Sequence, residues 1–256
     1  MITDTHAHLF WKNFDEDRAA VIERARTAGV ERIILVGTDL ETSRACKELC
    51  TERPGLYWTA GIHPHDADGI GDEALGEITA LCEDPACIAV GETGLDYFKE
   101  YSPKTEQRRL FRWHIALAKE LDKPVIVHCR DAHADTLALL REVPDVRGVM
   151  HCYTMGPEEL SSYVELGLYV SFSGVVTYPR NEANREAARL VPPDQLLVET
   201  DCPFLAPQSR RGKRNEPALV AEVLDCIAEV RGATREDLAR TTTANAARLF
   251  GLPPAG

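Results

Sequence analysis

The sequence predicts one α/β domain, a (β/α)8 barrel with an extra helix at its C-terminal end. Short apolar runs alternate with longer stretches of helical periodicity, which indicates repeated βα units. Runs such as 33–36 and 125–127 are apolar at nearly every position, as are strands of a parallel sheet that is covered on both faces. The length of 256 residues also fits, since such barrels typically contain about 250.

Eight apolar runs of strand length follow one another along the chain. They lie at residues 1–4, 32–37, 57–61, 87–91, 125–128, 148–151, 169–172 and 196–199. Eight such units favour a closed barrel, and the alternative is an open, doubly wound parallel sheet. No linker-like segment or internal repeat divides the chain, so we expect a single domain over residues 1–256.

Helical patterns separate these runs, and the clearest covers residues 104–121. Its apolar face is formed by Leu110, Trp113, His114, Leu117 and Leu121. We expect His114 to be a core or boundary residue rather than a ligand. Similar stretches open at Asp72 and Glu158, and the last pattern, 235–250, is expected to pack outside the barrel.

The charge balance restricts the classes of partner. Acidic residues outnumber basic ones 41 to 29, for a formal net charge of −12. Such a chain repels phosphates and anionic membranes, so a polyanion must be met by a local basic patch. No basic segment precedes an apolar stretch at the start, and no apolar run approaches the roughly 20 residues that a bilayer requires. We therefore expect a cytoplasmic protein without membrane contact, and the sequence indicates no protein partner.

Residues that commonly bind metals stand at the ends of the predicted strands. His6 and His8 are two positions apart at the end of the first strand, so the strand alternation points both imidazoles to one face. Four further candidates follow later strands, namely Glu92, His128, His151 and Asp201. The carboxyl ends of parallel barrel strands converge on one face, where catalytic residues are found. Any one of these residues alone could be an ordinary polar residue, but six buried polar groups without a task would be costly.

Four imidazoles and two carboxylates suffice for two divalent ions if one carboxylate bridges them. Glu92 is the expected bridge, and Asp201 is expected to orient a water and take its proton. Zinc, magnesium and manganese all remain possible as the metal. Asp96 and Glu199 are candidates for hydrogen-bonded support of the ligands.

The remaining histidines have less certain places. His63 and His65 bracket Pro64 after the third strand, where they could face the same mouth and contact substrate, or lie in a surface loop. His133 opens a helix, and the sequence indicates no partner for it.

The cysteines point to a reducing compartment. Eight are present without a Cys-x-x-Cys pair, so we expect free thiols and no zinc-finger site. Cys129, Cys152 and Cys202 each follow a proposed ligand, and we expect them in the outward strand positions as small apolar side chains.

A basic loop follows the last predicted strand. Within residues 208–217 it carries four positive charges, from Arg210, Arg211, Lys213 and Arg214. Because this loop must border the metal face, it is suited to guiding a phosphate, although charge runs are often merely solvated. Arg130 and Arg180 are expected to add to the same patch.

Six ordered motifs resemble the TatD family of metal-dependent deoxyribonucleases, within the amidohydrolase-like metal barrels. They read Asp-Thr-His-Ala-His at 4–8, Gly-Ile-His-Pro-His at 61–65, Gly-Glu-Thr-Gly-Leu-Asp-Tyr at 91–97, Pro-Val-Ile-Val-His-Cys-Arg-Asp-Ala at 124–132, Glu-Thr-Asp-Cys-Pro-Phe-Leu-Ala-Pro at 199–207 and Arg-Gly-Lys-Arg-Asn-Glu-Pro at 211–217. The resemblance spans nearly the whole chain. One departure is His-Cys-Tyr-Thr-Met at 151–155, where relatives often have His-Cys-Phe-Ser-Gly, so substrate shape can differ.

This resemblance implies a barrel with two metal sites. The first ion would be held by His6, His8, Glu92 and Asp201. The second would be held by Glu92, His128 and His151. The usual activity of such proteins is exonucleolytic cleavage of DNA.

The predicted function is therefore a metal-dependent hydrolase that cleaves DNA, as a single strand or at an end. One alternative is hydrolysis of a cyclic amide, a lactone or a D-aminoacyl-tRNA ester on the same barrel, since the fold does not determine the substrate. Another is a metal-loaded binding protein without turnover. The basic loop favours a phosphate-containing substrate.

Overall fold

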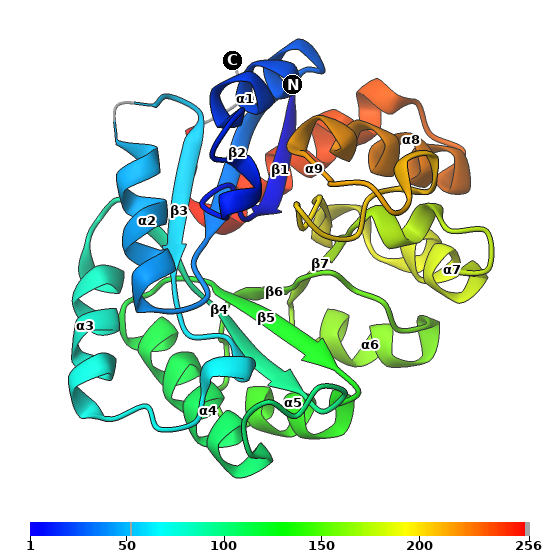
Figure 1. Cartoon of the computed structure of the whole chain (residues 1–256). Helices are drawn as coiled ribbons and strands as arrows, with labels where there is room; N and C mark the ends of the chain where they lie inside the picture. Colours follow the sequence, from blue (N-terminus) through cyan, green and yellow to red (C-terminus); the bar gives the residue numbers. More distant parts are fainter. Residues whose placement is uncertain (52, 254–256) are drawn as a thin grey trace.

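The computed structural model describes residues 1–51 and 53–253. Eight parallel strands pair in chain order, from β1 to β8, and helices surround them (Figure 1). The strands are β1 Ile2–Ala7, β2 Val30–Val36, β3 Leu56–Ala60, β4 Cys87–Asp96, β5 Val125–Arg130, β6 Gly148–Met150, β7 Tyr169–Phe172 and β8 Leu196–Val198. A parallel bridge between Ala7 and Cys202 joins β1 to the segment after β8. The barrel predicted from the sequence is thus confirmed, and the open sheet is not formed.

Three strands extend further than their hydrophobicity indicates. β1 continues to Ala7, β4 to Asp96 and β5 to Arg130, whereas the apolar runs stop at 4, 91 and 128. Thr93 still pairs with Val127, and Asp96 with Arg130. The hydrophobic pattern ends early because the upper part of the barrel interior carries polar side chains, so polarity does not mark the strand end here.

Nine α-helices are described, and most of them lie between successive strands. They are α1 Arg18–Thr27, α2 Leu40–Cys50, α3 Asp72–Glu83, α4 Lys104–Glu120, α5 His133–Arg141, α6 Pro157–Glu165, α7 Glu182–Leu190, α8 Val220–Arg231 and α9 Arg235–Phe250. Short 3-10 helices cover Lys12–Phe14, Pro64–Asp66, Gly174–Thr177, Pro193–Gln195, Gln208–Arg210 and Pro217–Leu219. The predicted helices at 72, 104–121, 158 and 235–250 are confirmed to within one residue at each stated end.

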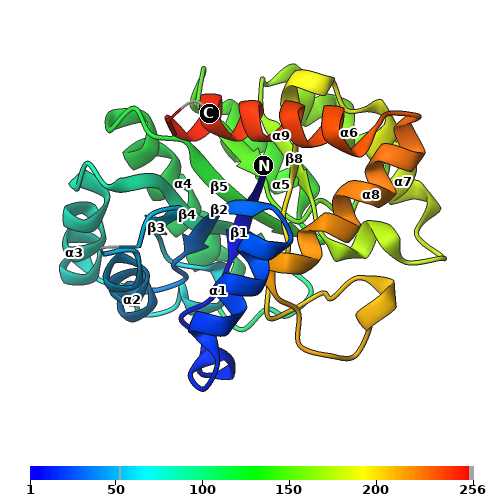
Figure 2. The ribbon, with the colours of Figure 1, turned by 90° about the horizontal axis from the view of Figure 1, so that it is seen from above.

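The last helix closes the amino-terminal end of the barrel. Figure 2 shows α9 lying across that end, close to the chain's N-terminus. Its buried residues Ala246, Leu249 and Phe250 pack with the following Leu252 against side chains that line the barrel. These lining residues are Ile34, Val36, Ala89, Ile126, Val149 and Leu197. The helix therefore lies outside the barrel, as predicted, and supplies its floor.

Along the inner face of the strands, the side chains change from apolar at this floor to polar at the opposite end of the barrel. Ile126 lies in the floor cluster, and His128 is two residues further along the same strand. Val149 and His151 repeat this spacing. Because strand side chains on one face recur every second residue, the positions above the apolar floor hold the candidate ligands. Among the described residues, none of the helices is long and apolar enough to span a membrane.

Candidate metal centre

β1 places His6 and His8 on the barrel interior. Their Nε2 atoms lie 3.1 Å apart, and both side chains are buried. His8 Nδ1 lies 2.9 Å from the carbonyl oxygen of Val36, which can only accept a hydrogen bond. The proton therefore belongs on Nδ1, which leaves the Nε2 lone pair of His8 free for a cation.

Glu92 lies at the centre of the candidate ligands. Its Oε2 atom is 3.3 Å from His6 Nε2 and 3.8 Å from His8 Nε2. Asp201 approaches the same pair, with Oδ1 at 3.3 Å from His8 Nε2 and 3.8 Å from His6 Nε2. Two imidazoles and the carboxylate of Asp201 thus converge on the Oε2 side of Glu92.

The other oxygen of Glu92 faces a different group of imidazoles. Oε1 lies 3.0 Å from His151 Nε2, 3.1 Å from His128 Nδ1 and 3.4 Å from His63 Nε2. The predicted ligand set did not include His63, which was expected to contact substrate, but His63 lies beside Glu92 among the candidate ligands. His63 lies in the loop after β3, directly before the 3-10 helix Pro64–Asp66, so the side-chain alternation of a strand could not indicate its direction.

A glycine allows the central strands to approach closely. Gly94, with φ of 140°, lies so near β5 that a Cβ atom there would be 2.0 Å from the carbonyl oxygen of His128. No other residue type fits this backbone without displacing β5. The close approach keeps Glu92 beside His128, and it gives a physical role to one glycine of the sequence Gly-Glu-Thr-Gly.

The segment that carries Asp201 is tied to β1. The amide of Asp201 donates to the carbonyl oxygen of His6 at 2.9 Å. Asp4 accepts from the amide and the hydroxyl of Thr200, at 2.9 and 2.6 Å. Burial raises the pKa of Asp4 to about 7, although these hydrogen bonds oppose the rise. Asp4 was not among the predicted site residues, and β1 is irregular between Asp4 and Ala7, so a regular strand alternation does not relate Asp4 to His6.

The two residues expected to support ligands lie where such support is needed. Glu199 Oε1 is 3.2 Å from His151 Nδ1 and accepts from the amide of Cys152 at 2.7 Å. Asp96 Oδ2 lies 3.1 Å from His128 Nε2 and 2.9 Å from His65 Nε2. Each carboxylate can orient one imidazole of the cluster, as the partners of metal ligands commonly do.

Charge interactions oppose burial throughout this cluster. Burial opposes ionisation of Glu92, yet the surrounding imidazoles hold its pKa well below the usual range. Burial lowers the pKa of His63 to about 4, and it also lowers that of His6. Burial likewise opposes protonation of His151, but the nearby carboxylates raise its pKa well above the usual value. Since a ligand imidazole must be neutral, cation binding here would release protons.

The donor set fits divalent cations. Three groups of residues each bring one ligand atom apiece to within 4.8 Å of one another. They are His6, His151 and Glu199; His6, His8 and Glu92; and His63, Glu92 and His128. His6 Nδ1 and Glu199 Oε2 are buried without a hydrogen-bond partner. Imidazole and carboxylate ligands together suit zinc or manganese, and magnesium where carboxylates and water dominate.

The predicted phosphate contacts differ in what they touch. Arg130 is exposed, with its guanidinium carbon 3.9 Å from the ring centre of Phe98. Arg211 lies over the ring of Tyr178 at 4.6 Å, and Lys213 and Arg180 are exposed. Arg214 instead forms an ion pair with Asp17 at 2.7 Å. Its charge is already neutralised, a pairing that local sequence could not indicate.

The histidines outside the cluster behave largely as expected. His114 is buried, and its Nε2 accepts from the amide of Ile62 at 3.1 Å, which makes it a structural residue of the core. His133 begins α5, and its Nδ1 lies 2.9 Å from the hydroxyl of Tyr163, a partner that the sequence did not reveal.

The cysteines correct one expectation. All eight are free thiols, as predicted. Cys129 lies on β5 with Sγ 3.7 Å from the hydroxyl of Tyr163, which belongs to the outer helix α6. The outward strand position is wrong for Cys152 and Cys202, because both lie beyond the ends of β6 and β8. The strands end sooner than their apolar runs suggested, and Cys152 instead contacts Ser173.

Comparison with known proteins gives consistent matches over the whole chain. A family model described as TatD related DNase matches residues 3–251. The Bacillus subtilis protein named "uncharacterized metal-dependent hydrolase YabD" is 44% identical over 254 residues, covering 98% of this chain and 100% of that protein. The "3'-5' ssDNA/RNA exonuclease TatD" of Citrobacter koseri is 39% identical, covering 97% of this chain and 98% of that one. The crystal structure of the TatD homologue YJJV from Escherichia coli superposes with a TM-score of 0.93 at 30% identity, covering 98% of each chain.

Proposed function

This chain belongs to the TatD family of metal-dependent hydrolases, and from that premise we propose that it removes nucleotides from single-stranded DNA. The related protein from Citrobacter koseri is named as a 3'-5' exonuclease of single-stranded DNA and RNA. Eight free thiols support a reducing compartment, and we place the activity in the cytoplasm.

One observation carries the proposal: the two oxygens of Glu92 face two separate groups of ligands. Oε2 is turned toward His6 and His8, and Oε1 toward His128 and His151. A carboxylate in this position is suited to bridge two cations. We propose two divalent ions, with Asp201 completing the first site and His63 close to the second.

When bound, the ions would supply an activated water and would stabilise charge on the phosphoryl and leaving oxygens. Asp201 would orient the attacking water and take its proton. Burial opposes ionisation of Asp201, but its close contact with His8 and the charge interactions with the neighbouring imidazoles keep its pKa below the usual value. The carboxylate is therefore ionised at neutral pH and able to accept a proton. Glu199 and Asp96 would hold His151 and His128 in position.

Phosphate contact is proposed for the exposed cations around this end of the barrel. Arg130 and the loop residues Arg211 and Lys213 offer positive charge on a chain whose net charge is −12. Arg214 was expected to act with them. Its ion pair with Asp17 supports instead a role in anchoring the loop. His65 borders the cluster through Asp96 and remains a candidate substrate contact.

The test is a parallel assay on three substrates. The purified chain, stripped of metal and reloaded with manganese, magnesium or zinc, is given a single-stranded DNA, an RNA and a D-aminoacyl ester. We expect metal-dependent shortening of the DNA, abolished by a chelator. Asp201→Asn, which keeps the shape but removes the proton acceptor, should lose about 10²-fold or more in turnover while remaining folded.

Two outcomes would contradict this function. Hydrolysis of the ester with an intact oligonucleotide would assign a different substrate class to the same centre. Full metal loading without turnover of any of the three would indicate a binding protein.

A further inference from the structure

The exposed aromatic side chains all lie at the end of the barrel that holds the metal centre. Among the described residues they are Trp11, Phe98, Tyr101 and Phe204, with exposed fractions of 37, 56, 65 and 47%. Each follows the carboxyl end of a strand, namely β1, β4 or β8. Three other large apolar side chains are exposed in the described part of the chain: Met1 and Leu190, which precede the amino end of a strand, and Leu205, which follows β8 next to Phe204. Among the described residues, exposed aromatic rings are thus confined to the end with the metal centre, and this confinement requires an explanation.

The first pair forms a wall beside His8. Trp11 follows β1 and Phe204 follows β8, and their rings meet edge to face with centres 5.8 Å apart. The ring of Phe204 lies 6.3 Å from that of His8. We call this pair the Trp11–Phe204 wall.

The second pair forms a wall beside His65. Phe98 and Tyr101 lie in the segment between β4 and α4, and the ring of Tyr101 is 4.8 Å from that of His65. The guanidinium of Arg130 lies 3.9 Å from the centre of the Phe98 ring. The ammonium of Lys99 lies 5.8 Å from each of the two wall rings. We call this pair the Phe98–Tyr101 wall.

The strand order sets the two walls on opposite sides of the metal centre. β1 and β8 are neighbours in the closed ring, whereas β4 and β5 are half a turn away from them. Figure 1 shows this separation between β1 and the pair β4 and β5. The Trp11–Phe204 wall lies beside His8, which faces Oε2 of Glu92. The Phe98–Tyr101 wall lies beside His65, and the Asp96 carboxylate contacts both His65 and His128.

Aromatic faces combined with cations are the binding surface of proteins that hold single-stranded nucleic acid. Every base has a π-face that stacks on such rings, and neighbouring cations meet the backbone phosphates. The Phe98–Tyr101 wall supplies both elements, since Arg130 and Lys99 adjoin its rings. On an acidic chain, this local positive charge favours a phosphate-linked base over an apolar peptide.

We propose that the two walls stack the bases that lie on either side of the scissile phosphate, an inference that rests on the proposed nuclease function. A stacked base must be unpaired, so the substrate has to present unpaired nucleotides on both sides of the metal centre. The walls thereby select a single strand or a frayed end, with tolerance for base identity. They position the substrate and take no part in the proton transfer.

The test is a double-mutant cycle in which a wall residue of the enzyme and a base of the substrate are removed, separately and together. Single-stranded oligodeoxynucleotides carry a tetrahydrofuran abasic residue on one or the other side of the scissile bond, or on neither. The enzymes are the wild type, Trp11→Ala and Phe98→Ala, with Leu190→Ala as the exposed apolar control at the opposite end of the barrel. We expect removal of a base to lower kcat/KM of the wild type by roughly fivefold to hundredfold, mainly through KM.

The cycle separates stacking from damage to the fold. Each alanine variant should become insensitive to the abasic residue on its own side, while it still discriminates on the other side. Trp11→Phe and Phe98→Trp should restore sensitivity, and Leu190→Ala should match the wild type. Equal cleavage of intact and abasic strands by the wild type would show that the walls do not stack bases, while the proposed nuclease function would still hold. Failure of the metal-loaded wild type to cleave any strand would instead overturn the nuclease function.

A second contrary result would be an alanine variant that remains as sensitive to abasic residues as the wild type. The base would then stack elsewhere, and the wall would have to serve a protein or a membrane. Metal content and circular dichroism of each variant show whether a loss of activity reflects binding or misfolding.

Discussion

The two ends of this barrel are built from the same strands but carry opposite chemistry. At the amino end, α9 closes the interior with Ala246, Leu249 and Phe250. At the carboxyl end, two residues further along the inward face, the same strands present imidazoles and carboxylates, as the steps from Ile126 to His128 and from Val149 to His151 show. One end stabilises the fold by burying apolar surface, and the other places charged groups close together.

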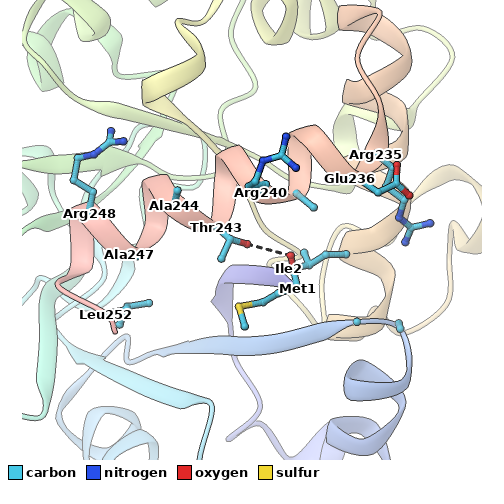
Figure 3. A pocket seen from close by; sticks show the side chains of 13 residues that line it. Met1, Ile2, Arg235, Glu236, Arg240, Thr243, Ala244, Ala247, Arg248 and Leu252 are labelled. Carbon is cyan, nitrogen blue, oxygen red and sulfur yellow. Dashed lines mark hydrogen bonds between the residues drawn. The ribbon is translucent and has the colours of Figure 1, made fainter. Parts of the chain in front are cut away.

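The more conspicuous hollow lies at the end without the candidate chemistry. A groove of about 960 Å³ runs between α9 and the start of β1, where the Thr243 hydroxyl donates to the carbonyl oxygen of Met1 at 3.4 Å (Figure 3). Its three arginines already have partners, and Arg248 donates to the carbonyl oxygen of Asp194 at 3.2 Å. Arg235 pairs with Asp225, and Arg240 with Asp237.

The difference between the groove and the metal end indicates which feature marks a functional site in this molecule. At the metal end, the atoms of His6, His8 and Glu92 approach one another at 3.1–3.8 Å. Such a cluster of lone pairs is suited to binding a cation, whereas the arginines of the groove already have ion-pair or hydrogen-bond partners. Convergent donors, rather than open volume, therefore mark the chemistry.

The largest effect is expected from the bridging carboxylate. Glu92→Gln removes the charge that both ion sites share, so metal content should fall below one ion per chain and turnover should fall by at least about 10²-fold. The fold should persist, because the stabilising apolar floor is at the other end. Elemental analysis with circular dichroism checks both parts, and two retained ions with normal turnover would refute the bridge.

A mutation in the floor should have the reverse effect. Phe250→Ala leaves a cavity beneath the barrel, and such truncations cost about 3–5 kcal/mol of stability. The metal content and the kcat of the molecules that remain folded should be close to wild type. Urea denaturation measures the loss of stability. A fall in metal content at temperatures where the variant is folded would show that the two ends are coupled.

The buried His114, which belongs to α4, allows a third test, in which stability is measured as a function of pH. Burial lowers the pKa of His114 to about 4, from 6.5 in the unfolded chain. The unfolded state therefore binds more protons between these values, and stability rises with pH across that window. The full contribution, about 3 kcal/mol, is present above pH 6.5 and lost as the pH falls to 4.

His114→Gln isolates this contribution. The free energy of unfolding, measured with a chelator from pH 4 to 7, should depend less steeply on pH in the variant than in the wild type. The chelator keeps metal binding from adding its own pH dependence. Parallel profiles would show that His114 does not titrate as its burial implies.

The same contrast explains what the sequence could and could not predict. His128 and His151 were predictable, because each follows an apolar strand and strand geometry then fixes its direction. Asp4 was missed, because its role depends on its contact with Thr200 and β1 is irregular between Asp4 and Ala7. His63 lies in a loop, directly before the 3-10 helix Pro64–Asp66, and Arg214 pairs with Asp17 almost two hundred positions away. Such contacts depend on how the elements pack, which no local pattern encodes.

The smallest expected effect concerns the basic loop, where two neighbouring cations differ in their partners. Arg211 lies over Tyr178 without an acidic partner in the described ion pairs, while Arg214 is held by Asp17. If Arg211 and Lys213 contact backbone phosphates, replacing both by alanine should raise KM for a single-stranded oligonucleotide. It should also lower the slope of log affinity against log salt by about 1.4, at about 0.7 per contact. Arg214→Ala removes one charge from the same loop, but that charge is already neutralised by Asp17, so the slope should stay at its wild-type value. Binding is measured with a chelator-inactivated or Asp201→Asn enzyme over a series of salt concentrations. An unchanged slope in the double variant would make the loop a solvated one, and an equal decrease in Arg214→Ala would mean that net charge, rather than phosphate contact, sets the salt dependence.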